Sequence, residues 1–235
     1  MTSAKKPTHL ATEPKFGFAL LFFCMIALLL IPGYFEDQET VGAASRWMLS
    51  LISLASLYLI AYRFHELLIG IVLVVPTVVM NWWSGLLPLN GGVYIVSALY
   101  IVFLCYIGFF IIRFIFETEE ISMDMIFAAL CLYMYIGLIW MFIYVIAEVS
   151  RPGSFSFPVE LPADPESYVN SLWNNFSYFS YVTLATLGYG DVTPLTRFTR
   201  AWAILEAVIG QMYLAVVVAR VIGLYIGNRR NNLPR

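Results

Sequence analysis

Charged residues are scarce in this sequence. Asp, Glu, Lys and Arg make up 12% of its 235 residues, against about 25% in an ordinary soluble domain. Hydrophobic residues make up 61%, against about 45–50% in a soluble domain. This balance excludes a soluble globular protein and predicts an integral membrane protein that is surrounded by membrane lipids. The formal net charge of −2 gives no indication of a nucleic-acid partner.

Cysteine and histidine are scarce as well. The three cysteines, Cys24, Cys105 and Cys131, lie inside apolar runs, and we expect small buried hydrophobic residues rather than a disulfide framework or a metal cluster. The sequence contains no recognisable nucleophile–base pair, metal-ligand cluster or phosphate-binding loop. We therefore expect neither enzymatic activity nor an organic cofactor.

Six apolar runs are candidates for membrane-spanning helices, which need about 20 residues. They cover residues 16–35, 47–62, 67–83, 93–116, a run from after Asp124 to about Val149, and 198–226. The first run is too long for a signal peptide, whose apolar part has about 7–15 residues. The second and third runs are short and are separated by Arg63, His65 and Glu66. Two helices joined by a tight turn are expected there, with one long broken helix or a re-entrant pair as the alternatives.

The segment 168–184 has a different character from these runs. It mixes aromatic and polar residues, follows a loop rich in Pro, Gly, Ser and acidic residues at 150–167, and is too short and too polar to span a membrane. Irregular backbone at membrane depth is tolerated only where protein buries it or where it lines water. The segment therefore fits a re-entrant pore helix, which would carry the loop that follows it into the membrane.

That loop consists of Thr186, Leu187, Gly188, Tyr189 and Gly190. Glycine permits backbone with φ > 0, and a run that alternates between left- and right-handed conformations can point successive carbonyls to the same side. Four such loops around an axis would form rings of oxygens that replace the water shell of a dehydrated cation. A Gly-x-Gly sequence alone would equally fit a simple tight turn, but the preceding helix and the flanking apolar runs favour the first interpretation.

The loop closely resembles the Thr-Val-Gly-Tyr-Gly signature of the potassium channel family, with Leu187 in place of valine. The resemblance implies that K⁺ is bound by the carbonyls of Thr186, Leu187, Gly188 and Tyr189 and by the Thr186 hydroxyl, with Gly190 completing the filter. It implies supporting roles for Thr183 and Asp191 and, because one chain carries one filter segment, a homotetramer. The resemblance is specific over residues 173–223, whereas before Asp124 it depends on the number of helices alone.

Two departures from the family pattern lie around the filter. Val182 stands where some members have a glutamate that pairs with the aspartate after the filter, here Asp191. Tyr178 and Phe179 stand where paired tryptophans often occur. We therefore expect Asp191 either to bond a tyrosine or tryptophan side chain or to face the outer mouth.

The last apolar run carries the remaining candidate residues. By the resemblance, Gly210 is a hinge, and Gln211, Leu214 and Val218 face a water-filled cavity. Close helix packing is the alternative explanation for Gly210. The same run contains Glu206, and an intramembrane carboxylate is by default a functional candidate.

Three roles are open for Glu206: concentrating cations near the pore, remaining protonated, or accepting hydrogen bonds behind the filter from Ser180 or Thr183. Glu206 and Gln211 are five positions apart, which is about 500° of rotation at about 100° per residue. They therefore do not share a face. With Gln211 on the cavity, Glu206 is expected to point toward the pore helix in a structural role.

The expected architecture is an all-α membrane protein with six spanning helices, a pore helix at 168–184 and a filter loop at 186–190. We divide the chain into a tail at 1–15, four peripheral helices at 16–120, a pore domain at 121–227 that ends in a helix at 198–226, and a basic tail at 228–235. Basic residues favour the cytoplasmic side of a membrane. We therefore expect a plasma-membrane protein with both termini in the cytoplasm. The basic residues concerned are Lys5, Lys6, Lys15, Arg63, Arg113, Arg229 and Arg230.

The function expected from these features is passive, potassium-selective conduction of the prokaryotic type without a cytosolic regulatory domain. The fourth run carries Arg113 alone, whereas a voltage sensor has about three to four gating charges per subunit, so weak or absent voltage dependence is expected. A non-selective cation channel and a non-conducting regulatory or scaffold protein with a vestigial filter are the alternatives. Membrane lipids are expected partners, and a separate gating partner remains open.

Overall fold

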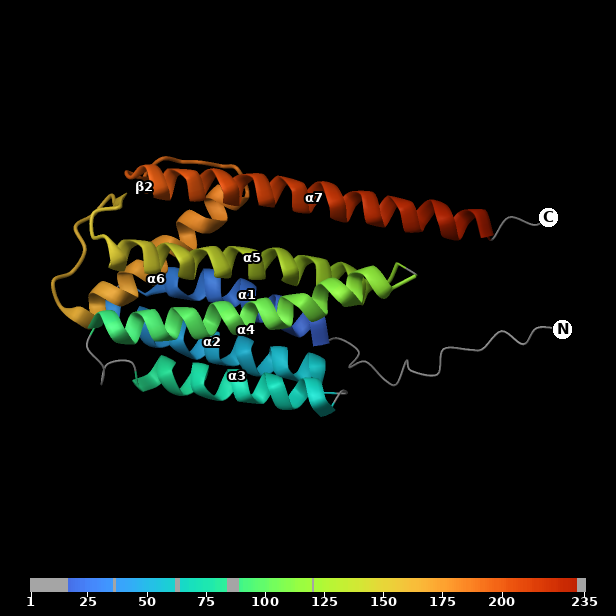
Figure 1. Ribbon diagram of the computed structural model, residues 1–235, viewed down its shortest axis with the longest axis horizontal. Coiled ribbons are helices and arrows are strands. Elements are labelled where there is room, and N and C mark those ends of the chain that lie inside the picture. The colour runs from blue at the N-terminus through green and yellow to red at the C-terminus, as the bar shows by residue number, and fades with distance from the viewer. Residues whose placement is uncertain (1–16, 36, 62–63, 84–88, 120, 232–235) are drawn as a thin grey trace.

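The computed structural model describes residues 17–35, 37–61, 64–83, 89–119 and 121–231 (Figure 1). Its elements in chain order are α1 (Gly17–Leu30), the 3₁₀ turn η1 (Ile31–Tyr34), α2 (Gln38–Ile60), α3 (Phe64–Trp83), α4 (Leu89–Glu117), α5 (Met123–Ser150), β1 (Phe155–Ser156), α6 (Pro165–Leu184), β2 (Thr193–Pro194) and α7 (Arg197–Asn231). Six helices among the described residues are long and apolar enough to cross a membrane. The predicted all-α membrane fold is confirmed, and the chain is a multi-pass membrane protein.

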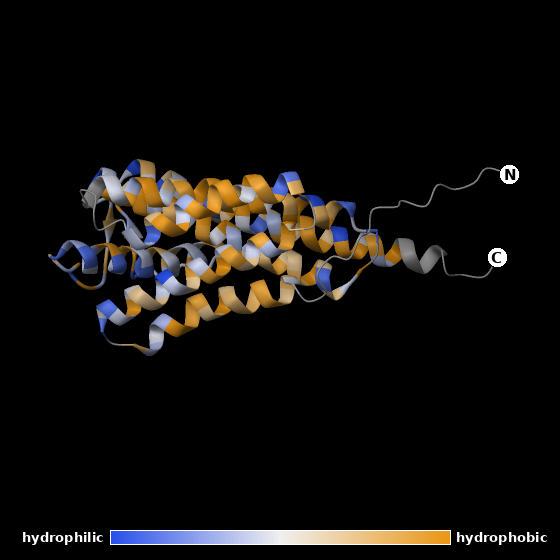
Figure 2. Cartoon of the chain, turned by 90° about the horizontal axis from the view of Figure 1, so that it is seen from below, coloured by the Kyte–Doolittle hydropathy of each residue, from blue (hydrophilic) through white to orange (hydrophobic). Residues whose placement is uncertain are grey.

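The spanning helices run back and forth along the long axis of the molecule, whereas α6 does not (Figure 1). It starts at the end where α5 finishes and stops partway along the bundle, and α7 then starts at the same end and runs the full length. β1 and β2 pair antiparallel at that end. Hydrophilic residues gather toward the ends of the helices and hydrophobic residues between them (Figure 2), as expected of helices whose middles lie in lipid.

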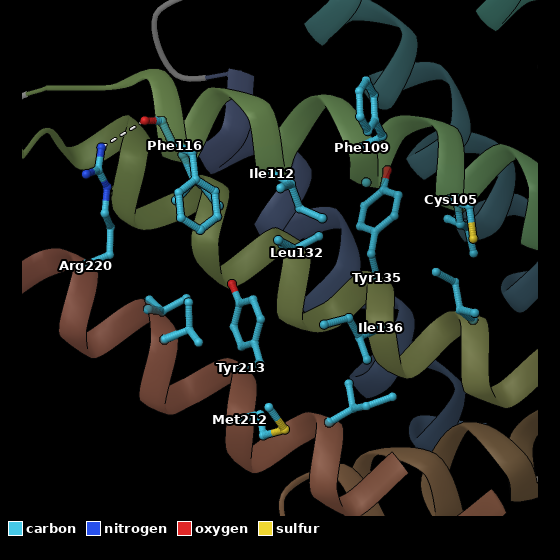
Figure 3. Close-up of a pocket in the computed structure, with 17 residues that line it drawn as sticks. Cys105, Phe109, Ile112, Phe116, Leu132, Tyr135, Ile136, Met212, Tyr213 and Arg220 are labelled. Atoms are coloured by element: carbon cyan, nitrogen blue, oxygen red, sulfur yellow. Dashed lines mark hydrogen bonds between the residues drawn. The ribbon is translucent and has the colours of Figure 1, made fainter. Parts of the chain in front are cut away.

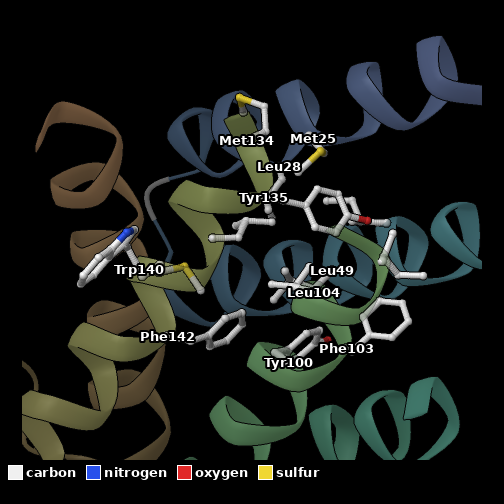
Figure 4. Close-up of a cluster of buried hydrophobic side chains, with 14 of the residues drawn as sticks. Met25, Leu28, Leu49, Tyr100, Phe103, Leu104, Met134, Tyr135, Trp140 and Phe142 are labelled. Carbon is white, nitrogen blue, oxygen red and sulfur yellow. The ribbon is translucent and has the colours of Figure 1, made fainter. Parts of the chain in front are cut away.

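Helix α5 forms the centre of the bundle. It is apolar all round, which is typical of a helix that lies in a protein core or spans a membrane. In α5, 61% of the span is buried, whereas in α7 only 6% is buried. Figure 4 shows the core that α5 shares with α1, α2 and α4, in which the rings of Tyr100 and Phe142 stack at 4.7 Å between centroids.

Several predicted boundaries differ from the structure. Helix α2 begins at Gln38 rather than at residue 47, because Asp37 caps it by accepting bonds from the Thr40 N–H (2.9 Å) and hydroxyl (2.7 Å). Helix α6 begins at Pro165 rather than at 168, because Asp164 accepts a bond from the Ser167 N–H at 2.8 Å. Side-chain caps of this kind begin a helix in polar sequence, where hydropathy gives no signal.

The C-terminal helix is also longer than predicted, since α7 runs from Arg197 to Asn231 instead of 198–226. The first run, predicted as one segment at 16–35, is divided into α1 and η1. The second and third runs are two separate helices, α2 and α3, so neither alternative arrangement is present.

The expectation of buried cysteines is wrong for Cys105. Cys131 is buried and Cys24 is partly buried, but Cys105 is exposed on α4, and all three are free thiols. Apolar residues of a membrane helix face lipid as readily as they face protein, so an apolar run does not predict burial.

Some predicted features lie outside the described residues. They are the tail at 1–15 with Lys5, Lys6 and Lys15, the positions Glu36 and Arg63, the residues from 232 onward, and the side chains of Arg229 and Arg230.

Candidate functional site

Aromatic packing fixes the position of α6 in the bundle. The Phe176 side chain is fully buried, and its ring lies 4.7 Å from that of Phe155, measured between centroids. The last turn of α6 continues into the loop through backbone bonds, from the Thr186 N–H to the Thr183 carbonyl and from the Leu187 N–H to the Val182 carbonyl, both at 2.9 Å. The end of the helix therefore determines where the loop starts.

The loop has alternating backbone handedness. The φ angle is positive at Thr186 (58°), Gly188 (60°) and Gly190 (82°), but not at the residues between them. For a side chain such as Thr186 this left-handed conformation costs about 1–2 kcal/mol, and such strained positions cluster at functional sites. The alternation expected from the sequence is present over five residues, more than a tight turn requires. In a single copy of the chain the loop is exposed, which leaves its oxygens accessible.

Tyr178 of α6 contacts both Tyr189 of the loop and Asp191, the residue that follows the loop. The ring of Tyr178 on α6 stacks on that of Tyr189 at 6.4 Å between centroids, with the planes 11° apart. The Tyr178 hydroxyl also donates to the Asp191 carboxylate and thereby lowers the pKa of Asp191. Of the two expectations for Asp191, the interaction with a tyrosine is present, and the carboxylate is also exposed in a single copy of the chain. Val182 and Phe179 are buried instead of bonding to it.

The chain beyond the loop is fastened to the end of α5. The Leu195 N–H donates to the Ser154 carbonyl at 2.8 Å, beside the β1–β2 pair. The Arg200 side chain donates to the Pro194 carbonyl at 3.1 Å. These bonds fix the segment that leaves the loop.

A buried carboxylate that the sequence interpretation missed organises the same region. Glu148 is 3% exposed and accepts bonds from the backbone N–H groups of Gly153 (2.7 Å) and Phe155 (3.0 Å). Its position in the sequence could have indicated this role, because Glu148 is a carboxylate within an apolar run, as Glu206 is.

Glu206 connects three helices. It is fully buried, and its two carboxyl oxygens lie 2.5 Å from the hydroxyls of Ser180 on α6 and Tyr144 on α5. The Ser180 hydroxyl is also 2.8 Å from the Gly137 carbonyl of α5. Glu206 thus points to α6, the predicted pore helix, as expected, and one of its two predicted partners is present. Within the described part of the chain no bond joins it to the other, Thr183.

The surroundings of Gly210 indicate close packing. A Cβ atom at this position would lie 2.4 Å from the Leu184 carbonyl oxygen at the end of α6. Helix α7 continues through Gly210 without interruption. The packing alternative thus accounts for the glycine in this conformation, and hinge bending remains a prediction.

The predicted cavity residues lie on an uncovered face of α7. Gln211, Leu214 and Val218 are all exposed in a single copy of the chain. The Gln211 amide nitrogen is 3.4 Å from the Thr186 hydroxyl, which is long for a hydrogen bond. Gln211 therefore lies beneath the start of the loop.

Among the described residues, no group of three or more His, Cys, Asp or Glu side chains could hold a metal ion. A cation at this site would instead meet backbone carbonyls and the Thr186 hydroxyl. Carbonyl oxygens are the ligands with which selectivity filters replace a hydration shell.

A helical membrane chain in which a non-spanning helix ends in a loop of alternating handedness is built as expected of an ion channel. Residues 154–226, from just before β1 into α7, match a family model described as "Ion channel". The chain is also 33% identical over 105 residues to Protein LctB of Bacillus caldotenax, and this match covers 45% of the chain and 75% of that protein. The chain therefore belongs to the ion channel family. No solved structure matches it.

Proposed function

We propose that this chain forms a potassium-selective channel that conducts K⁺ passively through a homotetrameric pore. The observation that carries the proposal is the alternation of backbone handedness from Thr186 to Gly190. Such a backbone can aim successive carbonyls at one line, and carbonyl rings around that line can replace the hydration shell of K⁺.

The uncovered surface of α7 supports the tetramer. Only 6% of its span is buried, although this span is about as apolar as that of α3, and the loop beside it is exposed. A single loop cannot surround an ion. Most homo-oligomers have closed symmetry, and four copies around one axis would bring four loops to that axis.

The support behind the loop favours selective over non-selective conduction. Both tyrosine rings, Tyr178 and Tyr189, and the Asp191 carboxylate form one connected group. This group takes the place of the tryptophans and of the glutamate–aspartate pair that the family often has. A loop held in this way resists the widening that would admit Na⁺ on equal terms.

We further propose that both termini are cytoplasmic in a plasma membrane. Arg113 and Arg220 lie near the end of the bundle where α4 and α7 finish, and Asp37 and Asp164 lie at the other end, where α2 and α6 begin. Basic residues concentrate on the cytoplasmic side. A separate partner is the proposed source of the gating signal.

The test is ion flux through the purified chain in liposomes, first under a K⁺ gradient and then under a Na⁺ gradient, with Ba²⁺ as blocker. Potassium-selective flux that Ba²⁺ blocks is the expected result. Equal flux of both ions would contradict selectivity and favour a non-selective channel. Absence of flux from a demonstrated tetramer, under every membrane potential and lipid composition tried, would favour a non-conducting role.

A further inference from the structure

A cavity of about 520 Å³ lies between α4, α5 and α7, in the half of the bundle where α7 ends (Figure 3). This volume is typical of ligand pockets, which measure about 300–1,000 Å³. The wall consists of aliphatic and aromatic side chains together with Cys105 and Gly108, and Arg220 is its only charged residue. A matching ligand would have a long apolar body and one anionic end.

Water is a poor occupant for the apolar part of this cavity. A buried water needs about two to four polar partners. Tyr135 and Tyr213 line the cavity, but the hydroxyl of the first is bonded to Ser56 and the hydroxyl of the second donates to the Ala129 carbonyl. Little polar surface therefore remains for water away from Arg220.

Arg220 carries a charge that no carboxylate balances within the described residues. One of its terminal nitrogens donates to the carbonyls of Phe116 (2.9 Å) and Thr118 (2.8 Å), and its guanidinium lies 5.9 Å from the centroid of the Phe116 ring. Its Nε atom is buried without a hydrogen-bond partner. By contrast, Arg113 pairs with Glu117 at 2.6 Å. Backbone carbonyls orient the Arg220 guanidinium and leave its charge available.

The mouth of the cavity lies on the surface of the membrane-spanning helices. Phe109, Ile112, Phe116 and Met212 belong to its wall and are also exposed, and on spanning helices such side chains contact lipid. Basic pockets between transmembrane helices bind anionic head groups, and a basic residue near the membrane surface attracts them. We infer that the cavity binds an acyl chain of an anionic membrane lipid whose phosphate group lies against Arg220.

An occupant of this cavity would contact the helix that carries the candidate pore residues. Met212 and Tyr213 line the cavity, and Gln211 and Leu214, their neighbours in sequence, lie on the face assigned to the pore. The lipid would also lie beside the bonds between Arg220 and the end of α4. Lipid binding would thereby favour one position of α7 relative to α4, independently of which ion the pore selects.

The test is native mass spectrometry of the purified full chain in detergent, with equal amounts of dioleoyl phosphatidylglycerol and dioleoyl phosphatidylcholine. Preferential retention of phosphatidylglycerol is expected. Arg220→Gln should reduce that preference about fivefold, which corresponds to about 1 kcal/mol for one basic residue near the membrane surface. Arg220→Lys keeps the charge and should keep the preference. Arg113→Gln removes a comparable arginine outside the cavity and should change nothing.

A second variant tests the apolar part. A Cβ atom at Gly108 would meet only Leu132, at 3.7 Å, so Gly108→Leu should fill part of the cavity and lower the retention of lipid. Gly91→Leu is the control, because this glycine of α4 also has open space around it but lies away from the cavity. Helix content from circular dichroism verifies folding, and if Arg220→Gln does not fold, Arg220→Lys and Gly108→Leu decide the question.

Unchanged lipid retention in both Arg220→Gln and Gly108→Leu would overturn the inference, and is the result expected if a second copy of the chain covers the cavity. Binding of inorganic phosphate as tightly as phosphatidylglycerol would also overturn it, because the apolar part would then have no function. Retention of both lipids in equal amounts by the unaltered chain would exclude the role of Arg220.

Discussion

The Ser180 hydroxyl lies 2.5 Å from a carboxyl oxygen of Glu206 and thereby joins α6 to α7 beside the loop that we propose as the filter. Tyr144 of α5 donates to the other oxygen of the same carboxyl group, also at 2.5 Å. One buried side chain therefore connects the three helices of the proposed pore module. This arrangement suits a structural role better than contact with permeating ions, because Glu206 is fully buried in a single copy of the chain.

Replacing Glu206 separates these roles. Glu206→Ala leaves the Tyr144 hydroxyl without its acceptor, whereas the Ser180 hydroxyl keeps the Gly137 carbonyl. Because one unmade buried hydrogen bond costs about 1–3 kcal/mol, we expect a loss of about 2 kcal/mol of stability. Glu206→Gln keeps an acceptor oxygen and should lose less. Thermal unfolding followed by circular dichroism measures both. Unchanged flux and unchanged tetramer stability in Glu206→Gln would remove both the structural and the conduction role of the charge.

Gly210 is the second position to test, because a Cβ there would lie 2.4 Å from the Leu184 carbonyl oxygen. Overpacking of this kind costs about 1–3 kcal/mol, so Gly210→Ala should lower both the yield and the thermal stability of the assembled protein. Gly91→Ala, at a glycine with open space around it, is the control. Full stability combined with altered opening in Gly210→Ala would favour the hinge instead.

The acid limit of conduction should depend on Tyr178, whose hydroxyl lowers the pKa of Asp191. A carboxylate with a lowered folded-state pKa contributes stability above its unfolded pKa, about 3.9 for Asp, and this stability is lost as the pH falls through the folded-state value. Tyr178→Phe returns the pKa of Asp191 toward its ordinary range. Acid inactivation should therefore occur at a higher pH in the variant.

Cation flux into liposomes at decreasing external pH measures this shift. Tyr34→Phe serves as the control, because Tyr34 is an exposed tyrosine of η1. Identical acid midpoints for the unaltered chain and Tyr178→Phe would show that the Tyr178–Asp191 bond does not support the conducting form.

Backbone handedness in the proposed filter is testable with two glycines of similar conformation. Gly188 (φ 60°) lies in the loop and Gly153 (φ 83°) lies in the turn after α5, and neither has a neighbour that a Cβ would meet. Alanine at either site costs about 1–2 kcal/mol of backbone strain. Gly188→Ala should in addition abolish selective flux, measured as the K⁺-to-Na⁺ flux ratio. An equal change in that ratio for Gly153→Ala would attribute the effect to general destabilisation.

Voltage should have little effect on opening. Arg113 is the only basic residue of α4 and forms an ion pair with Glu117 near the end of the helix. One charge crossing the whole field contributes about 2.3 kcal/mol per 100 mV, and a charge near the surface crosses little of it. Recordings in planar bilayers should show a shallow conductance–voltage relation that Arg113→Gln leaves unchanged. Steep activation by voltage would contradict this prediction.

Local sequence signals account for the overall fold and the position of the site. Apolar runs separated by polar turns predict the spanning helices, since lipid imposes the same requirement on every such segment. The polar segment before Thr186 predicts a helix that does not span. Gly188 and Gly190 predict two of the three left-handed positions of the loop, whereas Thr186 as a residue type does not predict the third. These inferences needed only neighbouring residues, because the requirements of the bilayer and the backbone preferences of glycine apply to each segment independently of the others.

Helix ends were predicted less well, because apolar runs do not mark the polar residues that begin a helix. The start of α2 depends on the cap formed by Asp37 and Thr40, and the start of α6 depends on Asp164 and Ser167. Hydropathy does not register a polar cap, so the predicted helices began too late.

The partners of the key side chains required the tertiary structure. Helical spacing placed Glu206 on the side away from Gln211, but only the packing of α5, α6 and α7 brings Tyr144 to it, from 62 positions earlier in the chain. The contact between Gly210 and Leu184 likewise depends on how two helices cross. A pattern within one helix determines which face a residue occupies. What that face meets depends on the relative placement of helices, which is decided by packing across the whole bundle.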